Sequence, residues 1–219
     1  AAQRQPGGMV SILGLDEDQI RRLCREVLAE LGSAPESASA GNLGEFDTPA
    51  ARGPSETTVL PNSSGPPGEI LMPVNFNCPG QIVLSGTRRA CERAARKAET
   101  YGAARAVPLN VAGAFHSPLM APAAEKLKTA LENCRFGTLN CPVVANVDAE
   151  PYQGPPSIPD KLLRQLVQPV LWQQTVERFL EEGLERFIEI GPGRVLTGLV
   201  KKTARFHGAK PVTVSYTHL

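Results

Sequence analysis

The stretch EILMPVNFNCPGQIVLSG, residues 69–86, holds two apolar runs, EILMPVNF and QIVLSG, on either side of the turn Asn77-Cys78-Pro79-Gly80. Runs of this length that are rich in β-branched residues, with a Pro-Gly turn between them, predict two β-strands joined by a tight connection. The sequence on both sides of this strand pair indicates which fold the pair belongs to.

A short strand is predicted on the N-terminal side, at MVSILGL, residues 9–15, and Asp16 can cap the helix that follows it. The apolar positions that carry this helix are Ile20, Leu23, Val27, Leu28 and Leu31. On the C-terminal side we expect a helix over residues 88–101 and a strand over residues 103–110. The order β-α-β-β-α-β over residues 9–110 predicts a ferredoxin-like subdomain, a fold that indicates no particular function.

Gly, Ser, Pro, Ala, Glu and Thr dominate the segment from residue 33 to residue 67. A segment of this composition buries too little apolar surface to offset the entropy lost on ordering. We therefore predict a disordered insertion over residues 33–67.

The remainder of the chain, residues 111–214, reads as part of a parallel-sheet α/β core. The expected elements are a helix after Ser117, a strand over 142–148, helices over 159–167 and 170–182, a strand over 186–190 and a helix after the Gly191-Pro192-Gly193 turn. Strand, Gly-Pro-Gly and helix in that order are typical of a βα turn in a doubly wound sheet. The two glycines could present helix N–H groups to an anion, but a tight turn that needs small residues is the favoured interpretation.

Composition excludes several classes of function. The net charge is +1, with 23 basic and 22 acidic residues and no basic stripe, which argues against nucleic-acid binding. The apolar runs are too short to span a bilayer, so we expect no membrane insertion. The five cysteines form no C-x-x-C pair, so a disulfide scaffold and a metal site are both disfavoured, and buried thiols in a reducing cytoplasm are expected.

VAGAFHSPLM, residues 111–120, holds the one histidine in the middle of the chain, His116. Ser117 can serve as a helix N-cap by accepting a backbone N–H, and Pro118 suits the first helical position. An imidazole at such a junction suits a general base, and it equally suits a packed structural histidine. The residues of this stretch leave both interpretations open.

A histidine base needs a nucleophile to activate, and the chain offers no serine in a G-x-S-x-G turn. Cys78 is the only thiol predicted on an exposed loop. No basic residue stands next to Cys78 to lower the pKa of its thiol, so it is a poor candidate for a nucleophile.

Five segments in this order, VNFNCPGQIVLSG, VAGAFHSPLM, PVVANVD, RQLVQPVLW and FIEIGPGRVLTGLVKK, resemble the malonyl-CoA–acyl carrier protein transacylases, the acyltransferases of fatty acid synthesis. The resemblance covers the C-terminal two-thirds of that family, from about Gln5 to Val214 without the insertion. It implies a fold of the α/β class, in which a partial α/β-hydrolase-like parallel-sheet core, residues 111–214, carries an inserted ferredoxin-like subdomain, residues 9–110.

The resemblance also implies a reaction and three site residues. A serine in a GHSxG turn, expected upstream of residue 1, takes the malonyl group from malonyl-CoA and passes it to the phosphopantetheine thiol of acyl carrier protein. His116 matches the general base, and Gln165 matches the residue whose backbone carbonyl orients the imidazole, so its side chain is expected to matter little. Phe115 matches the residue that restricts the acyl group to malonyl. No cofactor or metal is implied.

From the same resemblance we expect acyl carrier protein and malonyl-CoA as partners, a cytoplasmic location and a monomer. Without the serine, this chain is expected to be inactive alone. Alternatives are a non-catalytic module that binds the carrier protein, an acyltransferase domain of a polyketide synthase, and a transferase that uses Cys78. The family pattern stops near Val214, so residues 215–219 are expected to be a foreign tail.

Overall fold

The structure, a computed structural model, describes residues 7–32 and 68–216. The predicted insertion at 33–67 and residues 217–219 of the predicted tail lie outside these residues. The first part comprises β1 (Gly7–Leu13), α1 (Glu17–Glu30), β2 (Leu71–Cys78), β3 (Gln81–Thr87), α2 (Arg88–Lys97) and β4 (Arg105–Leu109). The second comprises α3 (Ala121–Glu132), β5 (Val144–Ala145), β6 (Glu150–Pro151), α4 (Ile158–Val167), α5 (Trp172–Glu181), β7 (Arg186–Ile190), α6 (Val195–Phe206) and β8 (Val212–Tyr216).

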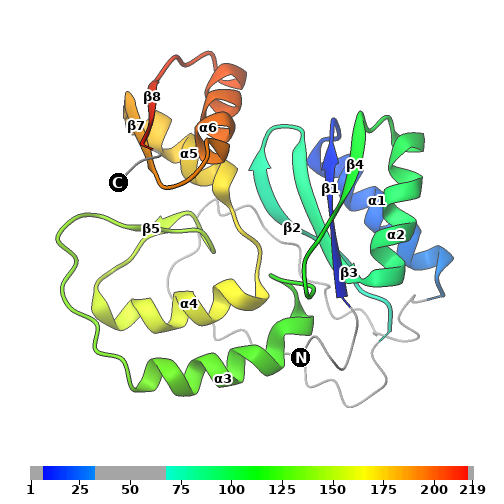
Figure 1. The fold of residues 1–219 in the computed structure, drawn as a ribbon, viewed down its shortest axis with the longest axis horizontal. Coiled ribbons are helices and arrows are strands. Elements are labelled where there is room, and N and C mark those ends of the chain that lie inside the picture. The colour runs from blue at the N-terminus through cyan, green and yellow to red at the C-terminus, as the bar shows by residue number, and fades with distance from the viewer. Residues whose placement is uncertain (1–6, 33–67, 217–219) are drawn as a thin grey trace.

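The first four strands form one sheet in the order β2-β3-β1-β4, with every neighbouring pair antiparallel (Figure 1). Ile12 in β1 pairs with Ile82 on one side and Ala106 on the other. Gly80 closes the turn between β2 and β3 with φ at 72°, a left-handed conformation that glycine adopts at little cost. The order of strands and helices along this part agrees with the order predicted from the sequence.

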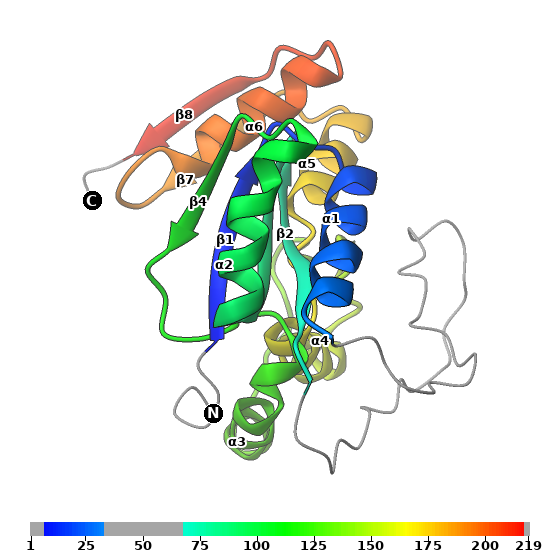
Figure 2. The ribbon, with the colours of Figure 1, turned by 90° about the vertical axis from the view of Figure 1, so that its right-hand side faces the viewer.

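Helices α1 and α2 lie side by side on one face of this sheet (Figure 2). Asp16 and Gln19 form a capping box at the start of α1, because each side chain accepts a hydrogen bond from the backbone N–H of the other, at 2.8 and 2.9 Å. The buried core between helices and sheet includes Val10, Ile12, Ile20, Leu23, Val27, Leu71, Phe76, Ile82, Leu84 and Ala94. This face of the sheet therefore holds the main apolar core.

The opposite face of the sheet carries a second, smaller apolar cluster of Met9, Val74 and Val83. Helices α5 and α6 contact β2 from this side (Figure 2). The segment before α5 joins the edge of β2 directly, because Val170 donates its N–H to the carbonyl of Val74 at 2.7 Å and accepts from the N–H of Phe76 at 2.9 Å. These two hydrogen bonds fix the end of α4 relative to the sheet.

The second part of the chain combines helices with two short sheets. Helices α3 and α4 pack against each other, and β5 and β6 form a small antiparallel hairpin beside them (Figure 1). Strands β7 and β8 run parallel, and α6 packs against both of them. The parallel pair agrees with the prediction of part of a parallel sheet. No helix among the described residues is long and apolar enough to cross a membrane.

The strand predicted over residues 142–148 is wrong in extent, because only Val144 and Ala145 are paired in a strand. The chain turns back soon after them. Asp148 accepts the N–H of Glu150 at 3.2 Å, and Ala149 adopts a left-handed φ of 54°. A short polar side chain that bonds the backbone two residues on favours a turn, and here it outweighs the apolar run before it.

Candidate functional site

His116 lies in a loop between β4 and α3, and its backbone adopts φ at 58°. A left-handed conformation is unfavourable for a residue with a side chain and persists only where its surroundings impose it. The next residue, Ser117, is fully buried, and its hydroxyl donates a 2.7 Å hydrogen bond to the carbonyl of Ala114. This bond closes a turn around the histidine.

The prediction that the Ser117 side chain caps the following helix is wrong. Its hydroxyl makes no capping bond, and a 3₁₀ turn, Pro118–Met120, separates it from α3. The hydroxyl donates backwards to Ala114 instead of accepting a helix N–H. The tight loop brings the Ala114 carbonyl within hydrogen-bonding distance of the buried Ser117 hydroxyl. The hydroxyl therefore bonds this carbonyl and does not cap the helix.

The start of β1 supports the same loop. A Cβ atom added to Gly7 would lie 2.5 Å from the backbone nitrogen of Ala114, so only glycine allows the two backbones to approach this closely. Ala114 itself is buried. The loop that carries the histidine is therefore packed against the first strand of the sheet.

Two of the residues singled out in the sequence meet in the structure. Nδ1 of His116 lies 2.7 Å from the backbone carbonyl oxygen of Gln165, although the residues are 49 positions apart. A carbonyl oxygen only accepts, so the Nδ1 atom carries the proton in this bond. No described residue forms a hydrogen bond with the other ring nitrogen, Nε2. In the neutral ring, Nε2 is then left free to accept a proton.

Phe115 is 36% exposed, so it is not part of either apolar core. The ring therefore lies at the surface of the loop and is not a core packing residue. The ring stands next to His116 in the chain and remains accessible to a ligand.

Charged residues on α4 fasten the helix to the β5–β6 hairpin. The ammonium group of Lys161, which is 8% exposed, donates to Asp148 at 3.0 Å and to the carbonyls of Glu150 and Pro151 at 3.1 and 3.2 Å. Arg164 reaches the second oxygen of Asp148 at 3.4 Å. A buried ammonium is tolerated only when paired and hydrogen-bonded, and all of these partners come from one turn.

Sequence reasoning missed this cluster. Lys161 and Asp148 stand 13 positions apart, in a helix and a turn, and no local pattern links them. The only signal in the sequence was the position of Lys161 among the apolar residues of α4. The cluster places α4, and with it Gln165, relative to the hairpin.

The prediction that Cys78 lies on an exposed loop is wrong. Cys78 ends β2 and is fully buried, and this burial raises the pKa of its thiol. Cys24 and Cys91 are also buried, whereas Cys134 and Cys141 are exposed, so the expectation of buried thiols holds for three of the five cysteines. A buried, protonated thiol has little nucleophilic character, which weakens the cysteine-dependent alternative further.

At the Gly-Pro-Gly turn before α6, N–H groups that could bind an anion already have partners within the protein. The carboxylate of Glu189 accepts the N–H groups of Leu196 at 3.1 Å and Thr197 at 2.8 Å. Hydrogen bonding from the side chain and backbone of Thr197 lowers the pKa of this carboxyl. The protein's own carboxylate therefore occupies the helix N-terminus, and the tight-turn interpretation is correct.

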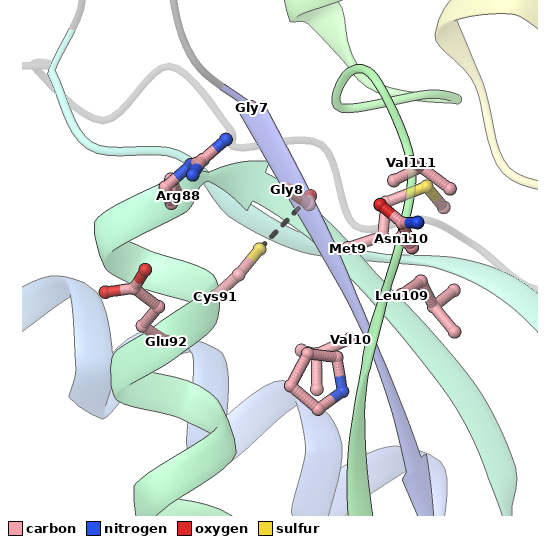
Figure 3. Close-up of a pocket in the computed structure, with 11 residues that line it drawn as sticks. Gly7, Gly8, Met9, Val10, Arg88, Cys91, Glu92, Leu109, Asn110 and Val111 are labelled. Atoms are coloured by element: carbon pink, nitrogen blue, oxygen red, sulfur yellow. Dashed lines mark hydrogen bonds between the residues drawn. The ribbon is translucent and has the colours of Figure 1, made fainter.

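A separate pocket of about 220 Å³ lies beside β1, the first turn of α2 and the end of β4 (Figure 3). The thiol of Cys91 points into it and donates to the carbonyl of Gly8 at 3.2 Å. Arg88 and Asn110 supply polar groups to its rim. The pocket does not include His116, and no group of three or more His, Cys, Asp or Glu among the described residues could hold a metal ion.

Comparison with known proteins gives one family match. A family model described as an acyl transferase domain matches residues 60–216. Malonyl CoA-acyl carrier protein transacylase of Bacillus subtilis strain 168 is 48% identical over 124 residues, covering 57% of this chain and 39% of the relative. The enzyme of the same name from Escherichia coli K12 is 37% identical over 196 residues, covering 90% of this chain and 51% of the relative.

Solved structures show the same likeness. A complex of a type II polyketide acyl-carrier protein with its malonyl-transacylase matches with a TM-score of 0.74 at 36% identity, over 97% of this chain and 55% of that chain. An acyl carrier protein S-malonyltransferase from Vibrio cholerae matches with a TM-score of 0.73 at 33% identity, over 97% of this chain and 56% of that chain. In the matches that cover 90% of this chain, the chain spans about half the length of the curated relatives.

Proposed function

This chain belongs to the acyl transferase domain family, and on that premise we propose that it is part of an enzyme that transfers malonyl groups from malonyl-CoA to acyl carrier protein. The relatives that carry the name malonyl CoA-acyl carrier protein transacylase support this substrate pair. The solved complex of an acyl-carrier protein with its malonyl-transacylase supports the carrier protein as partner. The polyketide origin of that complex keeps a role in polyketide synthesis as the alternative setting.

The observation that carries the proposal is the hydrogen bond between His116 and Gln165. A bond of 2.7 Å from Nδ1–H to a backbone carbonyl leaves the lone pair on Nε2. That tautomer is the one a general base requires, because the ring must accept a proton at the nitrogen that faces the nucleophile. Gln165 then has the orienting role that an acidic residue has in Ser-His-Asp triads.

The reaction follows a two-step, ping-pong course in this proposal. A serine hydroxyl from the part of the protein that precedes these residues attacks the thioester carbonyl of malonyl-CoA, and Nε2 of His116 takes its proton. The C–S bond breaks, and the imidazolium gives that proton to the leaving CoA thiolate. The phosphopantetheine thiol then loses its proton to Nε2 and attacks the malonyl-serine ester. The serine oxygen leaves and is reprotonated.

The arrangement of strands and helices supports a division of the chain into a subdomain and a core. We propose that residues 9–110 are a ferredoxin-like subdomain, supported by the antiparallel strand order β2-β3-β1-β4 with both helices on one face. Residues 111–214 then belong to an α/β-hydrolase-like core, supported by the parallel β7–β8 pair. His116 lies where the two parts meet, because its loop follows β4 and touches Gly7 through Ala114.

Radiolabelled malonyl-CoA tests the proposal. The full-length protein should retain one malonyl group covalently and pass it to acyl carrier protein, whereas the present chain alone should retain none. Replacing His116 by glutamine in the full-length protein should slow transfer by about a hundredfold or more, the usual scale of general-base catalysis. An unchanged rate would remove His116 from the mechanism. Stoichiometric labelling of the present chain would point to a nucleophile within it.

A further inference from the structure

The carbonyl that contacts His116 is available because of a proline four residues further on. In an α-helix, the carbonyl of Gln165 would accept the N–H of residue 169, but that residue is a proline and has no N–H. The preceding carbonyl, that of Arg164, still accepts the N–H of Gln168 at 2.8 Å. Gln165 therefore offers the first carbonyl at this end of α4 whose helical partner is missing.

The side chain of Gln165 holds the segment that leaves the helix. Its Nε2 atom lies 3.2 Å from the carbonyl oxygen of Gln168 and 3.2 Å from that of Pro169. A side-chain amide nitrogen donates two hydrogen bonds, so both donors are used on these carbonyls. The amide spans the point at which the backbone turns from helical to extended, with Gln168 at φ −123° and ψ 160°.

The departing segment is anchored at its other end as well. Val170, directly after Pro169, makes two backbone hydrogen bonds with β2, to Val74 and Phe76. Pro169 is buried, and a proline favours an extended conformation in the residue before it. The chain from Gln165 to Val170 is thus held by a helix, by its own side-chain amide and by the sheet.

Contrary to the expectation that the side chain of Gln165 matters little, we propose that its amide and the ring of Pro169 act together as a positioning device for His116. Pro169 keeps the Gln165 carbonyl free of a helical partner, and the amide holds that carbonyl 2.7 Å from Nδ1. The device fixes the proton of the neutral ring on Nδ1. The role of this device in catalysis rests on the proposed function. The tautomer of His116 does not, because it is a property of the chain without substrate.

A purely structural role of the Gln165 amide at the end of α4 predicts a different result. If the amide only terminated α4, its loss would lower the free energy of unfolding and leave the proton on the same ring nitrogen. If it positions the carbonyl, its loss shifts the proton from Nδ1 toward Nε2 in protein that is still folded. The choice of tautomer is set by the hydrogen bond that the ring makes, so it reports the position of the carbonyl directly.

The experiment is a two-bond ¹H–¹⁵N correlation spectrum of the imidazole rings in the ¹⁵N-labelled chain, recorded at pH 8. The His116 signals are identified by their absence in His116→Gln. Gln165→Met keeps the length of the side chain and removes both donors. The matched control is Gln173→Met, because the Gln173 amide donates to Glu177 at 2.8 Å on α5, within the same helix.

The wild-type chain and Gln173→Met should show the proton on Nδ1, and Gln165→Met should lose most of that population to the Nε2 form. Pro169→Ala restores an N–H at position 169 and should shift the tautomer in the same direction. This variant replaces Gln165→Met in the test if Gln165→Met does not fold. A folded Gln165→Met or Pro169→Ala with the wild-type tautomer would overturn the proposal. If full-length His116→Gln transfers malonyl groups at the wild-type rate while Gln165→Met still shows the expected tautomer shift, the proposed function alone is refuted.

Discussion

Replacing Gly7 by alanine is expected to displace the loop that carries His116. The added Cβ atom would lie 2.5 Å from the backbone nitrogen of Ala114 and 2.7 Å from its Cβ atom. Atoms of this kind do not approach closer than 3.0 Å, and neither neighbour is the end of a flexible side chain. The strain therefore has to be relieved by movement of the backbone, either in β1 or in the loop.

The size of the effect follows from these distances. Ordinary contact begins at 3.4 Å, so Ala114 has to retreat by about 1 Å. β1 pairs with β3 along its whole length and with β4 from Met9 onward, so we expect the loop to be the part that yields. The bond from His116 to Gln165 measures 2.7 Å, and a shift of that size takes it beyond hydrogen-bonding range. Misplacement of a catalytic group by about 1 Å can slow a reaction about a hundredfold.

The neighbouring glycine supplies the control. A Cβ atom on Gly8 would meet the Cα atom of Arg88 at 3.5 Å and the Cβ atom of Cys91 at 3.6 Å, which are ordinary contacts. The assay is malonyl transfer to acyl carrier protein by the full-length protein, with circular dichroism to verify folding. We expect a loss of about a hundredfold for Gly7→Ala and a change within about twofold for Gly8→Ala.

Equal rates for the two alanine variants, both folded, would refute the reasoning. The contact between Gly7 and Ala114 would then not set the position of His116. A loss in both variants, accompanied by lower thermal stability of both, would show that β1 as a whole and not the close approach at Gly7 is sensitive.

Phe115→Ser in the full-length protein should raise kcat/KM for methylmalonyl-CoA relative to malonyl-CoA by about 10- to 200-fold, because removing the ring makes room for one methyl group; a folded variant with an unchanged ratio would exclude Phe115 as the selectivity residue. Asp16→Ala should lower the free energy of unfolding by about 1 kcal/mol in urea titrations, because it removes the cap of α1, whereas an unchanged midpoint would mean that the capping box adds nothing. Burial raises the pKa of the Cys24 and Cys91 thiols to about 12, from 9.0 in the unfolded chain. The stability that this protonated state contributes is therefore complete below pH 9 and is lost as the pH rises from 9 towards 12; urea midpoints at pH 8 and pH 10.5 should differ, and Cys24→Ala should reduce the difference.

Local sequence was sufficient for most of the elements. Strand β3 and the turn at Pro79-Gly80 were readable because β-branched residues and a Pro-Gly pair act over a few positions. The start of α1 was readable because Asp16 and its capping partner Gln19 are only three residues apart. These features depend on neighbours along the chain, and the chain order of helices and strands follows from them.

Prediction failed at three places where the local pattern allows more than one outcome. The hydroxyl of Ser117 looked like a helix cap and instead closes the histidine turn through Ala114. Cys78 looked exposed because it stands in a turn-like sequence, yet it is fully buried at the end of β2. The apolar run after Cys141 looked like a full strand, and the Asp148 side chain shortens it.

The candidate site was determined in two stages. The sequence by itself predicted roles for His116, Gln165 and Phe115, because the motifs that contain them resemble one family and stand in its order. Only the tertiary structure brought the Nδ1 atom of His116 within 2.7 Å of the Gln165 carbonyl across 49 positions. We expect that contact to depend on the close approach at Gly7 and on the attachment of α4 by Lys161. No local pattern in the sequence encodes these contacts, because each joins backbones or charges that meet only after the chain has folded.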